Sequence, residues 1–245
     1  MPKAGRSSNG RTIPSEGMYL GSSPSLPALG KDKVDCLMAR QPASVLTNIC
    51  YNKNMKTAIL IHGYYNKSEF EDVTRPAASN DHWFPWVQRQ LLLKGIETQT
   101  PEMPGFFAPN YKKWKKMLEN FSPDENTILI GHSCGGGFLV RWLSENNVKV
   151  GKVVLVAPWL DLEKESKNID PEFFNFEIDP NIAQKTEGLT IMYSTDDHSS
   201  IQKSIEILKS KLIGAKFVEF TDKGHFTLSS LKTEEFPELL HVVLN

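Results

Sequence analysis

Five residues, Gly131-His132-Ser133-Cys134-Gly135, constrain the fold of this chain more than any other part of its sequence. They match the pattern G-x-S-x-G and lie between an apolar run, Thr127–Ile130, and a helical pattern that bears Phe138, Leu139, Trp142 and Leu143. A serine at such a junction projects its hydroxyl group from a tight, strained turn, and small flanking residues let neighbouring backbone segments approach closely. The pattern therefore predicts a strand–turn–helix unit with Ser133 as a nucleophile. The alternative interpretation is a chance Gly/Ser turn.

Apolar runs typical of buried strands alternate with helical patterns through residues 55–245. Strands are predicted at Ala58–Ile61, Ile96–Thr100, Thr127–Ile130, Val153–Val156, Leu189–Tyr193 and Lys216–Phe220. Helices are predicted at Tyr111–Leu118, after Ser133, at Ile201–Leu212, at Phe236–Val243, and in a segment capped by Asp81 with Trp83, Trp86, Val87 and Leu91 on one face. Continuous apolar strands that alternate with helices indicate a mostly parallel sheet covered on both faces, which is an α/β fold.

Two segments fall outside this alternation. Residues 1–30 are rich in Gly, Pro and Ser and have little apolar surface to bury, whereas the pattern of residues 31–54 is ambiguous. We expect the N-terminal extension 1–54 to be disordered. The stretch 6–27 also resembles the peptides that result when a transfer-RNA gene is translated within an open reading frame, so a misassigned start is an alternative. The stretch 161–188 is longer than an ordinary connection, and its three phenylalanines suggest a small lid over the site.

A serine hydroxyl is a poor nucleophile until a base takes its proton. His225 lies in Asp222-Lys223-Gly224-His225-Phe226, directly after the last predicted strand. An imidazole titrates near neutral pH and therefore suits this role. The sequence favours His225 as the base, whereas His82 and His241 are interpreted as surface histidines.

The acid that orients this histidine should lie between Ser133 and His225 in the chain, because this type of fold orders its triad as Ser, acid, His. Two adjacent candidates, Asp196 and Asp197, follow the strand Leu189–Tyr193. A carboxylate at the end of a strand can fix the tautomer of the histidine and stabilise the imidazolium. The alternative role for either acid is to cap the next helix.

An oxyanion hole in such a site uses two backbone N–H groups. One is expected from Cys134, which follows the nucleophile, and the other from Tyr64 in the loop His62-Gly63-Tyr64-Tyr65-Asn66, with Tyr65 as the alternative. The thiol of Cys134 is one position past the elbow, so we interpret it as structural and not as the nucleophile. The pairs Trp83/Trp86 and Trp114/Trp142 are interpreted as packing residues.

Composition excludes several other classes of protein. The formal net charge is −1, which favours neither a nucleic-acid partner nor a membrane-surface partner. Three cysteines without metal-site spacing predict neither a disulfide framework nor a metal site, and they are typical of a reducing cytoplasm. No apolar run is long enough to span a bilayer or to form a secretory signal. We expect no cofactor.

These motifs together resemble the small serine hydrolases of the retinoblastoma-binding-protein-nine and YdeN type. The resemblance covers most of Met55–Asn245 and also includes His82-Trp83-Phe84-Pro85-Trp86-Val87 and Pro101-Glu102-Met103-Pro104. It implies an α/β-hydrolase fold with a small cap or none, and it implies that the second acid, Asp197, belongs to the triad. The Leu-x-Cys-x-Glu signature for binding the retinoblastoma protein is absent around all three cysteines, so that partner is not expected.

The sequence thus predicts a cytoplasmic serine hydrolase that cleaves small esters, thioesters or amides through an acyl-enzyme. Two alternatives stay open. One is an acyltransferase on the same scaffold, in which another nucleophile replaces water. The other is a non-catalytic binding module that retains the fold.

Overall fold

The computed structural model describes residues 55–160 and 168–245. The extension 1–54, for which disorder is expected, lies outside the described residues, as does the first part of the long connection, 161–167. The helices and strands in chain order are β1 (Thr57–Ile61), α3 (Lys67–Glu71), η1 (Ala78–Asn80), α4 (Phe84–Leu93), β2 (Glu97–Gln99), α5 (Tyr111–Glu119), β3 (Thr127–His132), α6 (Cys134–Glu145), β4 (Val150–Val156), η2 (Ile182–Lys185), β5 (Thr186–Ser194), α7 (Ser199–Lys211), β6 (Lys216–Phe220), α8 (Leu228–Leu231) and α9 (Pro237–Leu244).

The strands form one six-stranded parallel sheet in the order β2-β1-β3-β4-β5-β6. All six residues of β3 are buried, whereas the strands at the two edges are more exposed: β2 has one buried residue between two exposed ones, and the residues of β6 are half-buried or exposed. This arrangement confirms the predicted parallel sheet. The predicted strand Ile96–Thr100 shortens to three residues, with Thr98 buried between the exposed Glu97 and Gln99.

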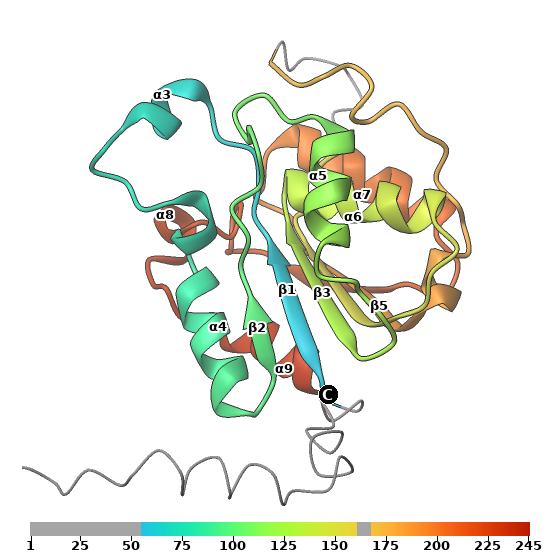
Figure 1. Cartoon of the computed structure of the whole chain (residues 1–245). Helices are drawn as coiled ribbons and strands as arrows, with labels where there is room; N and C mark the ends of the chain where they lie inside the picture. The colour runs from blue at the N-terminus through green and yellow to red at the C-terminus, as the bar shows by residue number, and fades with distance from the viewer. Residues whose placement is uncertain (1–54, 161–167) are drawn as a thin grey trace, which may run out of the picture. The chain divides into compact units, whose positions relative to one another are not determined.

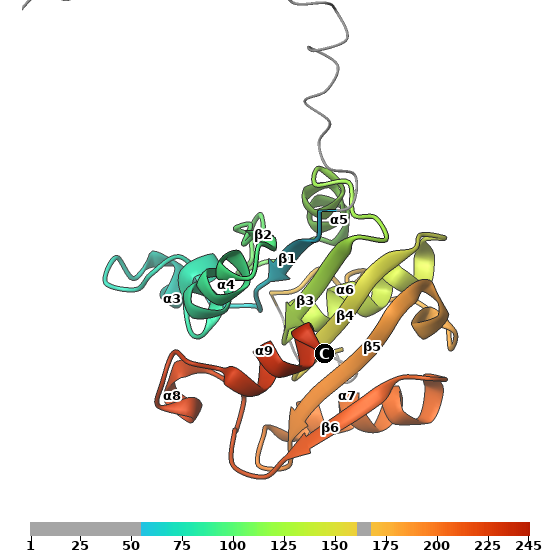
Figure 2. The same cartoon turned by 90° about the horizontal axis from the view of Figure 1, so that it is seen from below.

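Helices cover both faces of the sheet. Figures 1 and 2 show α4 and α9 on one face and α5, α6 and α7 on the other. Trp83 packs against Phe84 and Phe236 between α4 and the start of α9, and Trp114 packs against Phe138 between α5 and α6. Both tryptophans are fully buried, and Trp142 is 3% exposed, so the interpretation of these three as packing residues is confirmed. Trp86 is half-buried against the same core.

The predicted cap of α4 is wrong. The helix begins at Phe84 after Trp83, with Pro85 in its first turn, and no side chain caps it. The carboxylate of Asp81 instead accepts hydrogen bonds from the side chains of Arg75 and Tyr65 and from the backbone of His82. Both carboxylate oxygens of Asp81 are thus occupied by Tyr65, Arg75 and His82 and do not bind the first N–H groups of α4. The same hydrogen bonds connect different parts of the segment between β1 and α4.

In the described part of the long connection, Asn168 donates a hydrogen bond to the hydroxyl of Tyr64, whereas the phenylalanines that follow pack against the core. Phe173 is fully buried, with its ring centroid 5.2 Å from that of Trp114 and 6.3 Å from that of Phe138. Phe174 is half-buried beside Phe173, and it also contacts Trp159. The aromatic residues of this segment therefore extend the core over α5 and α6. Within residues 55–160 and 168–245, no helix is long and apolar enough to cross a membrane.

Candidate active site

The carboxyl ends of four parallel strands meet at one edge of the sheet, and each is followed by a segment that the sequence singled out. The loop His62–Asn66 follows β1, Ser133 follows β3, Asp197 follows β5, and His225 follows β6. Ligands of open α/β sheets bind at this edge because the loops there converge.

Ser133 occupies the sharp turn between β3 and α6. Its backbone angles are φ 53° and ψ −121°, a positive-φ conformation that a residue with a Cβ atom adopts at a cost of about 1–3 kcal/mol. Close packing explains the flanking glycines: a Cβ atom would lie 2.8 Å from the backbone of Gly136 if added to Gly131, and 2.4 Å from the carbonyl oxygen of Ile61 if added to Gly135. The strand–turn–helix unit predicted from G-x-S-x-G is thus present.

His225 lies close enough to Ser133 to exchange a proton with it. Its Nε2 atom is 3.0 Å from the Oγ atom of Ser133. Its Nδ1 atom is 3.0 Å and 2.9 Å from the two carboxylate oxygens of Asp197. Because a carboxylate accepts hydrogen bonds, Nδ1 donates to Asp197, which leaves Nε2 able to accept the proton of Ser133. The structure therefore brings together the three residues expected from the sequence.

The two adjacent acids face different partners. The side chain of Asp197 is fully buried, and its Oδ1 atom also accepts a 2.6 Å hydrogen bond from the backbone N–H of His198. Asp196 is exposed and accepts hydrogen bonds from the hydroxyl of Ser194 and from the backbone N–H of Gly224. The bond from Ser194 is the main reason that the pKa of Asp196 lies below its usual value. Neither acid caps α7 through its side chain, because His198 occupies that position, so the expected capping role is wrong.

The loop after β1 lies against Ser133. A Cβ atom on Gly63 would be 3.0 Å from the Cβ atom of Ser133 and 3.6 Å from its Oγ atom, so the backbone itself comes close to the hydroxyl. The Nε2 atom of His62 accepts a 2.9 Å hydrogen bond from the backbone N–H of Met103. The other ring nitrogen, Nδ1, therefore donates to the carbonyl oxygen of Gly63, 2.8 Å away.

This hydrogen bond orients the next peptide group. In a trans peptide the N–H points opposite to the preceding C=O. With the Gly63 carbonyl directed at the ring of His62, the N–H of Tyr64 is directed away from that ring. Burial lowers the pKa of His62, which keeps the ring neutral and able to accept from Met103 while it donates to Gly63.

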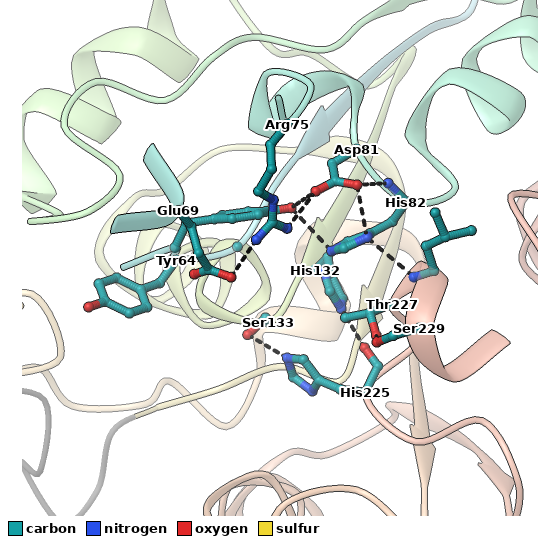
Figure 3. Close-up of a pocket in the computed structure, with 13 residues that line it drawn as sticks. Tyr64, Glu69, Arg75, Asp81, His82, His132, Ser133, His225, Thr227 and Ser229 are labelled. Atoms are coloured by element: carbon teal, nitrogen blue, oxygen red, sulfur yellow. Dashed lines mark hydrogen bonds and ion pairs between the residues drawn. The ribbon is translucent and has the colours of Figure 1, made fainter. Parts of the chain in front are cut away.

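Ser133 and His225 open onto a pocket of about 640 Å³. Figure 3 shows these two residues on one side and Glu69, Arg75 and Asp81 on another. The guanidinium group of Arg75 lies 2.6 Å from a carboxylate oxygen of Glu69 and 3.0 Å from one of Asp81. Burial opposes the ionised form of Asp81, but hydrogen bonds from His82 and Arg75 outweigh it and hold its pKa below the usual value. The far wall of the pocket is therefore charged and fixed by hydrogen bonds.

His82 is not the surface histidine that the sequence suggested. Its side chain is 11% exposed and lines the pocket. Its Nε2 atom is 3.1 Å from the hydroxyl of Tyr65, and its Nδ1 atom accepts a 3.2 Å hydrogen bond from the backbone N–H of Leu228. Sequence reasoning missed this residue because its partners lie far along the chain, and it also missed Glu69, Arg75 and His132.

The side chain of Cys134 is buried at the start of α6. Within the part of the chain that the structure describes, no cluster of three or more His, Cys, Asp and Glu residues could hold a metal ion.

Comparison with known proteins points to one family. The sequence profile of the serine hydrolases matches residues 58–243. The chain is 27% identical over 192 residues to the YdeN protein of Bacillus subtilis (strain 168), an alignment that covers 75% of this chain and 90% of YdeN. It is 29% identical over 164 residues to serine hydrolase RBBP9 from Rattus norvegicus, which covers 66% of this chain and 84% of that protein.

Solved structures show the same fold. The crystal structure of the ydeN gene product from B. subtilis has a TM-score of 0.59 at 24% sequence identity and covers 77% of this chain and 97% of that one. Est1E from Butyrivibrio proteoclasticus has a TM-score of 0.51 at 16% identity and covers 79% of this chain and 91% of that one. The α/β-hydrolase fold expected from the sequence is confirmed.

Proposed function

Because the chain belongs to the serine hydrolase family, we propose that it cleaves small ester, thioester or amide substrates through an acyl-enzyme intermediate. The proposed triad is Ser133 as nucleophile, His225 as general base and then general acid, and Asp197 as the carboxylate that orients His225. The observation that carries this proposal is the continuous set of hydrogen bonds from Asp197 through His225 to the Oγ atom of Ser133, with lengths of 2.9 and 3.0 Å.

The geometry supports a two-step reaction. In the first step, Ser133 attacks the carbonyl carbon while Nε2 of His225 takes the hydroxyl proton and then gives it to the leaving group. In the second step, a water molecule attacks the acyl-enzyme while His225 takes a proton from that water. The bond between the acyl group and Ser133 then breaks, and His225 returns the proton to the Oγ atom of Ser133. The buried carboxylate of Asp197 stabilises the imidazolium in both steps, because the positive charge forms next to it.

The proposed oxyanion hole consists of the backbone N–H groups of Cys134 and Tyr64. Cys134 is the first residue of α6, and a helix N-terminus favours a developing negative charge. For Tyr64, the support is the peptide orientation imposed by His62 and the closeness of Gly63 to Ser133. Removal of one such donor in other acyl-transfer enzymes costs about 3 kcal/mol of transition-state stabilisation.

The test is covalent labelling followed by kinetics. A fluorophosphonate probe is expected to modify Ser133 of the purified full-length protein, and mass spectrometry of the digest locates the modified residue. The variant Ser133→Ala is expected to stay folded and to lose turnover of p-nitrophenyl acetate by a factor on the order of 10⁴ or more. Unchanged turnover in the pure variant would overturn the proposed function.

A further inference from the structure

The residue before the proposed nucleophile is also a histidine, and its side chain reaches the loop that carries His225. The Nε2 atom of His132 lies 2.8 Å from the carbonyl oxygen of His225, 93 residues further along the chain. A carbonyl oxygen can only accept a hydrogen bond, so Nε2 of His132 carries a proton and donates it. Figure 3 shows the rings of His132 and His225 beside each other, and it shows the hydrogen bond between the hydroxyl of Ser133 and the imidazole of His225.

The surroundings of His132 keep its ring uncharged. The residue is 3% exposed, and its ring contacts the rings of Trp83 and Phe84. Burial, followed by the nearby His225 and His82, lowers the pKa of His132 well below its usual value. This neutrality has a consequence for catalysis. The ring centroids of His132 and His225 are 5.0 Å apart, so a charged His132 would oppose the imidazolium that must form on His225.

We propose that His132 is a positioning residue: as a neutral donor, it holds the carbonyl group of His225 and thereby keeps the imidazole of His225 aligned with Ser133. The inference rests on the proposed function, because it assumes that His225 is the base. Its basis is that His132, the last residue of β3, and Ser133, the next residue, both bind His225. The hydroxyl of Ser133 lies 3.0 Å from the imidazole of His225, and the ring of His132 lies 2.8 Å from its carbonyl oxygen. The end of β3 therefore positions both the side chain and the main chain of His225.

Other contacts hold the neighbouring parts of the same loop. The N–H of Lys223 donates to the hydroxyl of Ser194, the N–H of Gly224 donates to Asp196, and the N–H of Leu228 donates to His82. Phe226, directly after His225, is fully buried. The anchors at Lys223 and Gly224 come from the end of β5 and the residues after it, so loss of the His132 hydrogen bond should leave the loop folded and should let the His225 backbone shift. The expected effect is therefore on kcat more than on stability or KM.

The matched pair of variants is His132→Gln and His132→Asn. The side-chain amide of glutamine lies near the position of Nε2 in histidine, whereas that of asparagine lies near the position of Nδ1. Both variants place an uncharged amide in the same buried site, and they differ in whether the donor reaches the carbonyl of His225. Turnover of p-nitrophenyl acetate is measured for both, beside the wild type and Ser133→Ala, well below each melting temperature.

We expect His132→Asn to lower kcat about 10-fold to 100-fold with little change in KM, since displacement of a catalytic group by about 1 Å costs up to about 10²-fold. His132→Gln is expected to retain kcat within about 3-fold because its donor reaches the same carbonyl. Equal kcat values for the two variants would overturn the inference, whether both are active or both are impaired. If the wild type showed no turnover that depends on Ser133, the proposed function would fail instead.

A spectroscopic measurement tests the geometry without reference to activity. The ¹⁵N chemical shifts of the His132 ring are expected to show a protonated Nε2 and an unprotonated Nδ1 from about pH 5.5 to about pH 8, on either side of the ordinary histidine range. If the ring of His132 only filled space and donated no hydrogen bond, neither tautomer would be favoured. A ring that titrates in this interval, or that carries its proton on Nδ1, would overturn the role as a neutral donor to His225.

Discussion

The carboxylate of Asp196 accepts a 2.9 Å hydrogen bond from the backbone N–H of Gly224, the residue directly before His225. Ser194, at the end of β5, binds the same loop one residue earlier, through the N–H of Lys223. Asp197 meets the ring of His225 itself. The two adjacent acids therefore bind different parts of the same loop: Asp196 binds the main chain that leads to His225, and Asp197 binds the side chain of His225.

Asp197→Asn is expected to lower kcat about 10⁴-fold while the fold is retained, because an amide in this position favours the wrong tautomer of the histidine. Asp196→Asn is the matched control, since it changes the same group at the next residue. Its expected loss is at most about 10-fold, because the amide oxygen of asparagine can still accept hydrogen bonds from Ser194 and Gly224. Steady-state kinetics on both variants, with circular dichroism as the check of folding, decides between the two acids.

The opposite ranking of the two variants would assign the triad to Asp196. If neither substitution mattered, the acid would lie elsewhere, and Asp161, which is outside the described residues, would be the next candidate.

Local patterns were sufficient for the sheet and for two residues of the proposed triad, Ser133 and His225. The apolar runs predicted the strands, and each of these two residues follows a strand or its turn. For the acid, the local pattern left Asp196 and Asp197 as candidates, and the family resemblance selected Asp197. The wall of the pocket could not be found in this way. His82 looks like a surface residue until Leu228, 146 residues away, donates to its ring, and Asp81 looks like a helix cap until Arg75 binds it. Such roles arise from contacts between distant segments, which neither periodicity nor spacing records.

A chain that begins at Met55 is expected to fold and to keep the full kcat of the complete chain. The reason is the abrupt change in sequence there, from unpatterned Gly, Pro and Ser to the first strand, Thr57–Ile61. Differential scanning calorimetry and turnover of p-nitrophenyl acetate compare the two chains. A clearly lower melting temperature for the shorter chain would show that residues 1–54 contribute to the stability of the domain.

Gly135→Ala is expected to destabilise the protein by about 1–3 kcal/mol, the usual cost of forcing extra atoms into a packed interior. The new Cβ atom would lie 2.4 Å from the carbonyl oxygen of Ile61 and 2.5 Å from that of His62, and neither backbone group can move without disturbing β1 and the loop after it. Gly188→Ala, in β5, is the control, since a Cβ atom there meets nothing within 4 Å, and its effect should stay within about 0.5 kcal/mol. Urea unfolding monitored by tryptophan fluorescence gives both values, and equal destabilisation would contradict the close packing at the elbow.

The buried neutral histidine His132 should make the protein less stable in acid. Its pKa is lowered in the folded state, so below about pH 6.5 the unfolded chain takes up a proton at this residue that the folded chain does not. Stability is therefore full above that pH and falls as the pH decreases, by about 1.4 kcal/mol per pH unit for one such group. His62 acts in the same direction, because burial lowers its pKa as well.

The measurement is the free energy of unfolding in urea at pH 7 and at pH 5.5, for the wild type and for two variants. His132→Gln removes the buried titrating group, so its loss of stability between the two pH values should be smaller than that of the wild type by about 1 kcal/mol. His241→Gln, which removes an exposed histidine from α9, controls for the loss of any histidine. The difference between the variants isolates His132, because carboxylates contribute equally to both. If His132→Gln lost as much stability in acid as the wild type, His132 would have to be protonated in the folded protein at pH 5.5. The proposed alignment of His225 depends on a neutral His132, so the same result would contradict that proposal.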